Sequence, residues 1–373
     1  MKLTIKKSVS LTVLLATLFV TWLSVGMVEP VKKKKPELSG ILASGSTDKT
    51  IKIWDIKTGK TIKTFKGHKG SIESMAFSPD GKNFASGFSD GIVKVWDTIT
   101  WQNLQILKNH KGLIKSVAFS VDSLLLASGS SDKKIKIYEN KGGKWKLIKQ
   151  TLSMDEEVSS VAFGPKITNY IVAADRSAIK IWENISKTGW KYKNTQTFKI
   201  KNDGLFYGTV LSSDECIANI SSSEVIEFFD KKSDSLWKKT ESFKFKHGTI
   251  ISLAFYPKDP NLLTVRTSDG FIILLEKKGA QWAAKSILGV VTPELRYATT
   301  VVFSPDGKYL AIALKDGRIQ IFSIKTGKLI KSLQGHKKGV LCLAWHPKPK
   351  VTKKILKKEK KKMPWDIIIK FKE

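Results

Sequence analysis

The chain is poor in arginine. Only four of its 65 basic residues are arginine, so lysine supplies nearly all of the excess behind the net charge of +32. Recognition of phosphates and bases usually draws on the planar, two-pronged guanidinium group, which lysine lacks. The basic balance therefore supports nonspecific attraction to acidic partners. A specific nucleic-acid role remains an alternative that the composition does not favour.

Cysteine and histidine are also scarce. The two cysteines, Cys216 and Cys342, fall on strands that we expect to lie far apart, which argues against a disulfide framework. The five histidines are not grouped with serine, cysteine or paired carboxylates as catalysis would require. The sequence has no phosphate-binding glycine-rich loop, no metal-spaced Cys/His cluster and no hydrolase elbow. We therefore predict no catalytic residue, no metal and no cofactor, and a protein that is not an enzyme.

An uncharged apolar run marks the N-terminus. Residues 8–28 carry no charged side chain, and lysines both precede and follow them. This pattern fits an export signal with small residues at 24–26 for cleavage, and it also fits an uncleaved helix that spans a bilayer of about 30 Å. A buried element of the fold is the third alternative. We predict that residues 1–28 direct the chain to export or to a membrane, and that 29–38 form a linker.

The rest of the chain is dominated by a repeat. An alternating strand that ends in an aromatic residue and an acid appears as IKIWD at 51–55 and VKVWD at 93–97, then in increasingly altered forms. The aromatic positions lie 42 to 47 residues apart, at Trp54, Trp96, Tyr138, Trp182, Phe229, Leu275 (where the aromatic is lost) and Phe322. A period of this size predicts a radial array of four-stranded blades.

The blades can be traced strand by strand, from strand a at the centre to strand d at the rim. Blade two is predicted from Ile72–Phe77, Asn83–Phe88, Ile92–Asp97 and Leu104–Leu107. Blade one lacks strand a at its own end of the chain, and Val340–Trp345 supplies it from the far end. We therefore predict an all-β, seven-bladed propeller over residues 39–347, closed by its C-terminal strand and monomeric, followed by a basic tail at 348–373.

Four polar positions recur with the repeat: a loop histidine, a serine on strand b, an aspartate in the b–c turn and an aromatic residue on strand c. They are His336, Ser44, Asp48 and Trp54 in blade one, His68, Ser86, Asp90 and Trp96 in blade two, and His110, Ser128, Asp132 and Tyr138 in blade three. A buried aspartate or histidine is costly unless it finds partners, which such a set would provide.

These positions resemble the WD-repeat family of β-propellers, over about 310 of the 373 residues. The resemblance implies that the four side chains form a buried hydrogen-bonded set, and that the protein is a non-catalytic platform for other proteins. Blades four to seven lack parts of the pattern, so we expect them to rely more on apolar packing.

Two surfaces are candidates for partner binding. The first is a ring of cations in the loops of one face: Lys69, Lys111, Lys338, Arg176, Arg296 and Arg318. Solvated loop charge is the simpler explanation, and contact with an acidic protein is the functional one. The second is a set of tryptophans that follow the c–d turn: Trp101, Trp145, Trp190, Trp237 and Trp282. We expect these to cover the outer strands, with an exposed aromatic belt as the alternative.

The sequence thus predicts a protein-binding scaffold or adaptor that is exported or membrane-tethered. An RNA-associated propeller that uses its lysine-rich surface and tail is the alternative, and the partner itself cannot be named.

Overall fold

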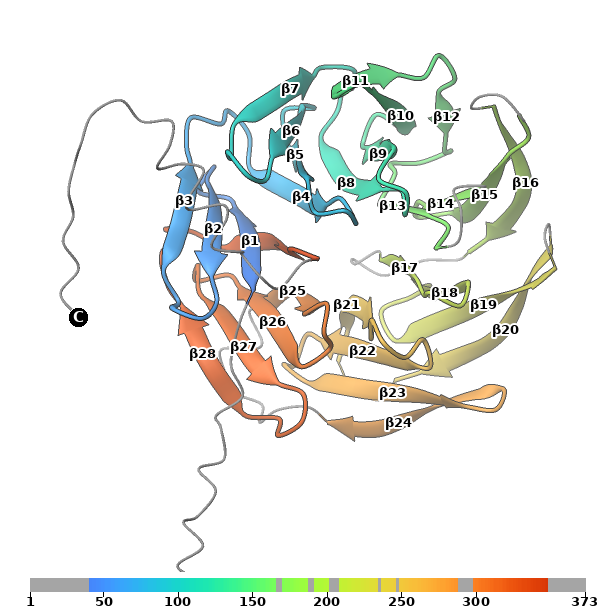
Figure 1. Ribbon diagram of the computed structural model, residues 1–373. Coiled ribbons are helices and arrows are strands. Elements are labelled where there is room, and N and C mark those ends of the chain that lie inside the picture. Colours follow the sequence, from blue (N-terminus) through green and yellow to red (C-terminus); the bar gives the residue numbers. More distant parts are fainter. Residues whose placement is uncertain are drawn as a thin grey trace, which may run out of the picture. The chain divides into compact units, whose positions relative to one another are not determined.

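The computed structural model describes residues 40–165, 170–186, 191–200, 208–233, 236–245, 248–287 and 298–347. Within these residues every regular element is a β-strand, and the strands form seven antiparallel sheets around a common centre (Figure 1). The predicted all-β, seven-bladed propeller is therefore confirmed. The segments at 1–38 and 348–373, together with His247, Arg296 and Trp190, lie outside the described residues.

The first three blades each run outward from an innermost strand. Blade one comprises β29 (Val340–Trp345), β1 (Ile41–Ser46), β2 (Ile51–Asp55) and β3 (Thr61–Phe65). Blade two comprises β4 (Ile72–Phe77), β5 (Asn83–Phe88), β6 (Val93–Asp97) and β7 (Asn103–Leu107). Blade three comprises β8 (Ile114–Phe119), β9 (Leu125–Ser130) and β10 (Lys134–Lys141), with β11 (Lys144–Leu147) and β12 (Leu152–Ser153) both paired to β10.

The remaining blades follow the same order. Blade four comprises β13 (Ser160–Phe163), β14 (Tyr170–Ala174), β15 (Ala178–Asn184) and β16 (Tyr192–Lys199). Blade five comprises β17 (Thr209–Leu211), β18 (Cys216–Ile220), β19 (Val225–Ser233) and β20 (Leu236–Lys244). Blade six comprises β21 (Ile250–Phe255), β22 (Leu262–Thr267), β23 (Ile272–Lys278) and β24 (Gln281–Ile287). Blade seven comprises β25 (Ala298–Phe303), β26 (Tyr309–Leu314), β27 (Ile319–Ser323) and β28 (Leu329–Leu333).

The two ends of the repeat array meet in blade one. Strand β29 pairs with β1 in antiparallel register, with Ser44 opposite Leu343 and Leu42 opposite Trp345. The innermost strands contact one another in the cyclic order β29, β4, β8, β13, β17, β21 and β25, and β25 again contacts β29. The ring of blades is therefore closed.

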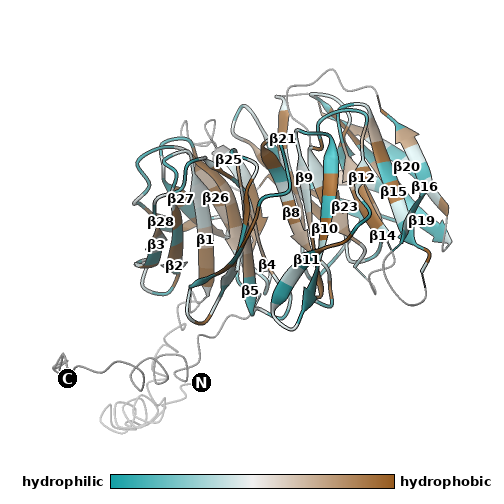
Figure 2. Cartoon of the chain, turned by 90° about the horizontal axis from the view of Figure 1, so that it is seen from above, coloured by the Kyte–Doolittle hydropathy of each residue, from teal (hydrophilic) through white to brown (hydrophobic). Residues whose placement is uncertain are grey.

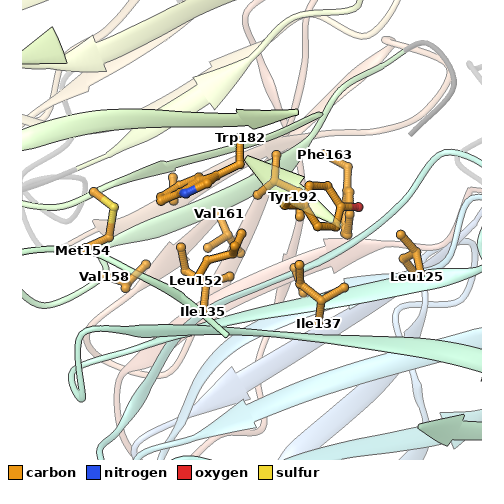
Figure 3. Close-up of a cluster of buried hydrophobic side chains, with 13 residues drawn as sticks. Leu125, Ile135, Ile137, Leu152, Met154, Val158, Val161, Phe163, Trp182 and Tyr192 are labelled. Carbon is orange, nitrogen blue, oxygen red and sulfur yellow. The ribbon is translucent and has the colours of Figure 1, made fainter. Parts of the chain in front are cut away.

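The hydrophobic core lies between successive blades. In Figure 3, Ile135, Ile137 and Leu152 of blade three face Val161, Trp182 and Tyr192 of blade four. Strand b is covered on both sides by neighbouring blades, so all six residues of β1, β9 and β26 are buried. Hydrophilic residues instead gather on outer strands such as β16 and β20 (Figure 2).

Glycine on strand b allows neighbouring blades to approach closely. A Cβ atom added to Gly87 would lie 2.4 Å from Cγ2 of Ile114 on the next blade, and one added to Gly129 would lie 2.5 Å from Cγ1 of Val158. No side chain fits these positions without displacing the next strand a. The glycines of the repeat are therefore packing residues.

An amide clamp joins the outer strands of neighbouring blades. In three blades a glutamine of the outer edge bonds to the backbone of an aromatic residue on the next blade. The pairs are Gln105 with Trp145, Gln150 with Tyr192 and Gln196 with Trp237. For the third pair, Gln196 Nε2 donates to the Trp237 carbonyl at 2.7 Å and Oε1 accepts from its N–H at 2.8 Å. The side-chain amide thus replaces a strand partner for one residue.

Equivalent positions in other blades use different chemistry for the same purpose. Glu241 accepts only the N–H of Trp282, at 2.7 Å. Lys331 of blade seven donates to the carbonyls of Ile56 and Lys57 in blade one, at 3.1 and 2.8 Å. The contact between outer strands of neighbouring blades therefore recurs at an equivalent position, although the residue that makes it differs between blades.

The tryptophans that follow the c–d turn are largely part of the core. Trp145, Trp237 and Trp282 are buried, and Trp101 is half-buried against Phe65 and Phe77. The alternative of an exposed aromatic belt is wrong for the three buried residues, because each packs between its own blade and the preceding one. In blade four, Tyr192 takes the clamped position that the spacing assigns to Trp190.

Replacing Gln196 with leucine should lower the free energy of unfolding by about 1–3 kcal/mol, because the backbone N–H and carbonyl of Trp237 lose their partners. Urea unfolding measures the change. The control is Gln281→Leu at an exposed position of β24, where a change within about 0.5 kcal/mol is expected. Equal losses in the two variants would contradict the clamp.

Candidate functional site: the loop face

Two kinds of loop meet at one edge of blades one and two, the loop that enters strand a and the turn between strands b and c. Backbone hydrogen bonds join them: Thr47 donates to the Gly339 carbonyl at 3.0 Å, and Ser89 to the Ser71 carbonyl at 3.0 Å. We call the surface formed by these loops and turns the loop face. The polar sets that the sequence singles out lie at this edge of the blades.

Blade one has a complete polar set. His336 Nε2 lies 2.7 Å from Ser44 Oγ, and its Nδ1 lies 3.0 Å from Asp48 Oδ2. Trp54 Nε1 donates to Ser44 Oγ at 2.7 Å. The Lys337 backbone N–H also donates to Asp48, at 2.9 Å. A histidine near the C-terminal end of the propeller therefore anchors residues at its N-terminal end.

The electrostatics of this set fit a neutral imidazole beside an ionised carboxylate. Burial lowers the pKa of His336, although Asp48 opposes that effect. Burial alone would raise the pKa of Asp48, but hydrogen bonds from Thr50, from the Lys337 backbone and from His336 outweigh it and lower the pKa. Ser44 can then accept from Trp54 and donate to Nε2, while Nδ1–H donates to the carboxylate.

Blade three repeats the histidine, serine and aspartate contacts, whereas the hydroxyl of Tyr138, which stands in place of tryptophan, is buried without a hydrogen bond. His110 Nδ1 lies 2.9 Å from Asp132 Oδ2, and its Nε2 lies 2.8 Å from Ser128 Oγ. The Lys111 backbone donates to Asp132 at 2.9 Å. Tyr138 is fully buried, and burial raises the pKa of its hydroxyl above the usual range.

Blade two carries all four residues of the set, but the structure does not bring them all together. Trp96 Nε1 donates to Ser86 Oγ at 2.9 Å, as expected. His68, however, accepts from the Lys94 ammonium through Nδ1 at 3.0 Å, and its Nε2 is buried without a hydrogen bond. Asp90 is exposed, with one long contact of 3.3 Å to the N–H of Ile92.

Phe88 explains the difference. Blades one and three have Ser46 and Ser130 at this place, and each hydroxyl accepts the N–H of the turn aspartate, at 3.0 and 3.1 Å. Phe88 makes no such bond, and its buried ring lies against the His68 ring, with the centroids 4.6 Å apart. The bulk of the phenylalanine directs His68 toward Lys94 and leaves Asp90 facing solvent.

Blades four and six keep only parts of the pattern. Asp175 is buried and accepts from the backbone of Glu156, Ser177 and Ala178, which lowers the pKa of its carboxyl despite burial. In blade six, Arg266 occupies the strand-b place of Gly45 and is 1% exposed; burial lowers its pKa to about 10, so it remains charged at neutral pH. Nothing in the sequence pattern singles out this buried arginine.

The predicted cations differ in their surroundings. Lys69, Lys111 and Lys338 are exposed, as is Arg176, whereas Arg318 is held by Asp316 at 2.7 Å. The residue equivalent to Lys69 and Lys111 in blade one is Lys337, not Lys338, because its backbone N–H makes the same bond to the turn aspartate as that of Lys111. Two lysines follow His336 in the sequence, so the sequence can be aligned with the other blades through either of them.

An acidic cluster interrupts the cations at the entrance to blade four. Glu157 lies 2.5 Å from Lys115, Glu156 lies 3.6 Å from Lys133, and Asp155 lies 3.0 Å from Lys180. A small polar pocket of about 190 Å³ opens here, lined by Lys115, Glu156, Glu157, Ser159 and Arg176. The local charges largely neutralise one another.

The histidines and cysteines of the described residues lie in structural contacts or are buried. His336, His110 and His68 are engaged in or beside the polar sets, and His346 contacts the Gly81 carbonyl at 3.1 Å. Within the described ranges, no three His, Cys, Asp or Glu side chains are grouped closely enough to hold a metal. Cys216 and Cys342 are free and buried, and burial raises the pKa of both thiols. The same part of the chain contains no helix long and apolar enough to cross a membrane.

A closed ring of seven similar blades, stabilised by repeated polar sets between loops, defines a repeat β-propeller. The model "WD domain, G-beta repeat" matches residues 36–55, 59–97 and 101–139, and the model "Anaphase-promoting complex subunit 4 WD40 domain" matches residues 285–348. These matches span blades one to three and blade seven with the closing strand. The chain belongs to the WD-repeat family, whose propellers are generally non-catalytic scaffolds for protein interactions.

Relatives match the chain over very different lengths. Protein tipD of Dictyostelium discoideum is 26% identical over 320 residues, covering 83% of this chain and 42% of tipD. The Lissencephaly-1 homolog of Heterostelium pallidum is 50% identical over 44 residues, covering 12% of this chain and 11% of that protein. The chain spans less than half the length of either relative.

Among solved structures, the β-propeller domain of Cps50 (Swd1) from Myceliophteria thermophila is similar, with a TM-score of 0.61 and 19% sequence identity. The match covers 74% of this chain and 90% of that domain. At this identity the likeness establishes the fold alone.

Ser44→Ala should lower the free energy of unfolding by about 1–3 kcal/mol, because it removes the partner of both Trp54 Nε1 and His336 Nε2. Ser86→Ala is the matched control, since only Trp96 Nε1 loses a partner there, and its effect should be smaller. Denaturant unfolding of the two variants gives the comparison. An equal or larger effect of Ser86→Ala would show that His336 contributes nothing through Ser44.

His68 should make stability depend on pH. Burial, and secondarily the charge of Lys94, lower the pKa of His68 to about 4, against 6.5 for an ordinary histidine. Below pH 6.5 His68 binds a proton in the unfolded chain, whereas in the folded protein it stays neutral until about pH 4. The contribution of neutral His68 to the free energy of unfolding is therefore fully present above pH 6.5 and is lost as pH falls toward 4. His68→Gln should reduce the slope in this window by up to about 1.4 kcal/mol per pH unit. An NMR titration that placed His68 near pH 6.5 would refute the assignment.

Proposed function

We propose that this protein is a non-catalytic scaffold or adaptor that binds other proteins through the loop face. The main support for the proposal is that exposed lysines lie on loops whose conformation is held by buried hydrogen bonds, as in the His336 and His110 sets. A rigid platform with solvated charges can bind a partner without losing much loop freedom.

The proposed contact residues are Lys69, Lys111 and Lys338, to which the structure adds Lys337. Arg176 is exposed beside the blade-four pocket, and it extends this surface. Arg318 contributes less charge, because Asp316 already holds its guanidinium. Arg296 stays a prediction from the sequence. The surplus of positive charge favours an acidic partner, whose approach it would accelerate.

We also propose that residues 8–28 direct the chain to a membrane or to export. The support is the uncharged, apolar composition of this segment and the lysines on either side. Cleaved signal and uncleaved anchor are both compatible with that pattern.

Charge reversal on the loop face should abolish partner capture. The variant is Lys69→Glu, Lys111→Glu and Lys338→Glu together, and the matched control reverses Lys82, Lys258 and Lys308, three exposed lysines in the turns between strands a and b. Affinity capture from the cell of origin, followed by mass spectrometry, compares the two at low and high salt. Capture that survives in the loop-face variant but fails in the control would place the binding surface elsewhere. Capture of RNA with a steep salt dependence would favour the nucleic-acid alternative.

A further inference from the structure

Five of the turns between strands b and c share one position with positive φ. In blades two, six and seven it is held by Gly91, Gly270 and Gly317, with φ of 80°, 95° and 91°, whereas blades one and three have Lys49 and Lys133, with φ of 63° and 65°. In all five turns the N–H of this residue donates to the carbonyl three residues earlier. The backbone is therefore the same, and only the side chain differs.

A lysine at this position is disfavoured by its backbone. Left-handed φ values suit glycine and strain a residue that has a Cβ atom. Lys133 has local partners in the Asp155 carbonyl and in Glu156. Lys49 is exposed, and among the described residues its ammonium has neither an ion pair nor a hydrogen bond. A strained backbone conformation at a side chain that makes no contact within the fold is typical of a residue that contacts a binding partner.

Lys49 belongs to a group of exposed lysines on neighbouring blades. We define the basic sector as Lys315 of blade seven, Lys337, Lys338 and Lys49 of blade one, Lys69 of blade two and Lys111 of blade three. Within the described chain none of the six ammonium groups lies in an ion pair. The loops of the sector approach closely between blades seven and one and between blades two and three: an added Cβ at Gly317 would lie 2.6 Å from the His336 carbonyl, and one at Gly91 would lie 2.9 Å from the Gly112 carbonyl.

The carboxylates of the same turns do not neutralise these lysines. Asp48 and Asp132 point inward and accept from histidines and from the Lys337 and Lys111 backbone, and Asp316 binds Arg318. Asp90 is the exception, because Phe88 leaves it exposed. Most carboxylates of these turns are therefore hydrogen-bonded or ion-paired within the protein, while the lysine ammonium groups of the basic sector are exposed to solvent.

The acidic cluster at blade four limits the sector on one side. Asp155, Glu156 and Glu157 each pair with a lysine, so the positive potential falls between the Lys111 loop and that entrance. The loop face is thus polarised, with unpaired positive charge over blades seven, one, two and three.

We propose that the basic sector binds a carboxylate-rich segment of a partner protein, laid across the loops of blades seven to three. This rests on the proposed function, since it names the partner chemistry for part of the same face. Lysines are strongly hydrated point charges, so a set of them spread over four blades suits a run of dispersed carboxylates, whereas arginine is the residue preferred for nucleic-acid recognition. The sector's neighbouring arginine, Arg318, is already occupied by Asp316.

The test uses fluorescein-labelled oligoglutamate as the probe and measures fluorescence anisotropy with the full chain. Reversal of Lys49, Lys69, Lys111 and Lys337 to glutamate should weaken binding at least about tenfold. The control reverses four exposed lysines outside the sector, Lys144, Lys193, Lys238 and Lys258, with the same change in net charge and an expected loss below about twofold. Circular dichroism and melting confirm that both variants fold.

Lys49→Gly provides a second, milder variant. It should raise the melting temperature by relieving the positive-φ strain and should also weaken probe binding, because the charge is lost. Weaker binding in a more stable protein cannot come from misfolding. Unchanged probe binding in this variant would overturn the role given to Lys49.

Three outcomes would overturn the proposal. Equal losses in the sector and control variants would mean that net charge alone attracts the probe. Single-stranded RNA bound more tightly than oligoglutamate, and lost in the sector variant, would assign the sector to nucleic acid. If the sector variant loses the probe but still captures protein partners, the scaffold function stands and the acidic-segment inference fails.

Discussion

The antiparallel pairing of β29 with β1 is the contact on which the rest of the propeller depends. Each blade is stabilised by packing its strand b against strand a of the next blade, so every blade needs a neighbour on both sides. Without β29, blade one would have three strands, and β1 would expose a row of unpaired backbone groups beside the Gly45 position. The closure joins the two ends of the repeat array. It also brings His336 to Ser44 and Asp48, so the most complete polar set lies at the junction.

The polar sets show how one neighbouring residue changes the outcome of a repeated pattern. Blades one and two both carry histidine, serine, aspartate and tryptophan at the expected places, yet only blade one connects them all. The difference is Phe88, which cannot accept the turn N–H that Ser46 accepts and whose ring occupies space beside His68. The sequence motif specifies which polar side chains are present, whereas the packing of neighbouring residues decides which of them form hydrogen bonds.

The loop face separates charges by direction. Asp48, Asp132 and Asp175 in the b–c turns are drawn inward, because backbone N–H groups and, in blades one and three, histidines need acceptors there. The lysine neighbours of these aspartates stay in water, because a buried ammonium would be costly. Because the lysines are exposed and these aspartates are not, the turns present a mainly basic surface to solvent. It also explains why net charge alone says little about the surface, since the blade-four cluster contains lysines that are fully engaged.

The sequence by itself determined the seven-bladed fold, its closure and its family, because a fixed period of strands and turns can bury its apolar faces only by stacking in a ring. It also located the loop histidines His68, His110 and His336, since each follows strand d in the repeat. The tertiary structure decided which polar groups are bonded, gave Lys337 the place assigned to Lys338, and put Tyr192 where Trp190 was expected. It alone disclosed the glutamine clamps and the buried Arg266, which depend on contacts between blades. The physical reason is that the period fixes the backbone of each blade, whereas the side-chain contacts depend on local packing, as at Phe88, and on residues of the neighbouring blade, as in the glutamine clamps.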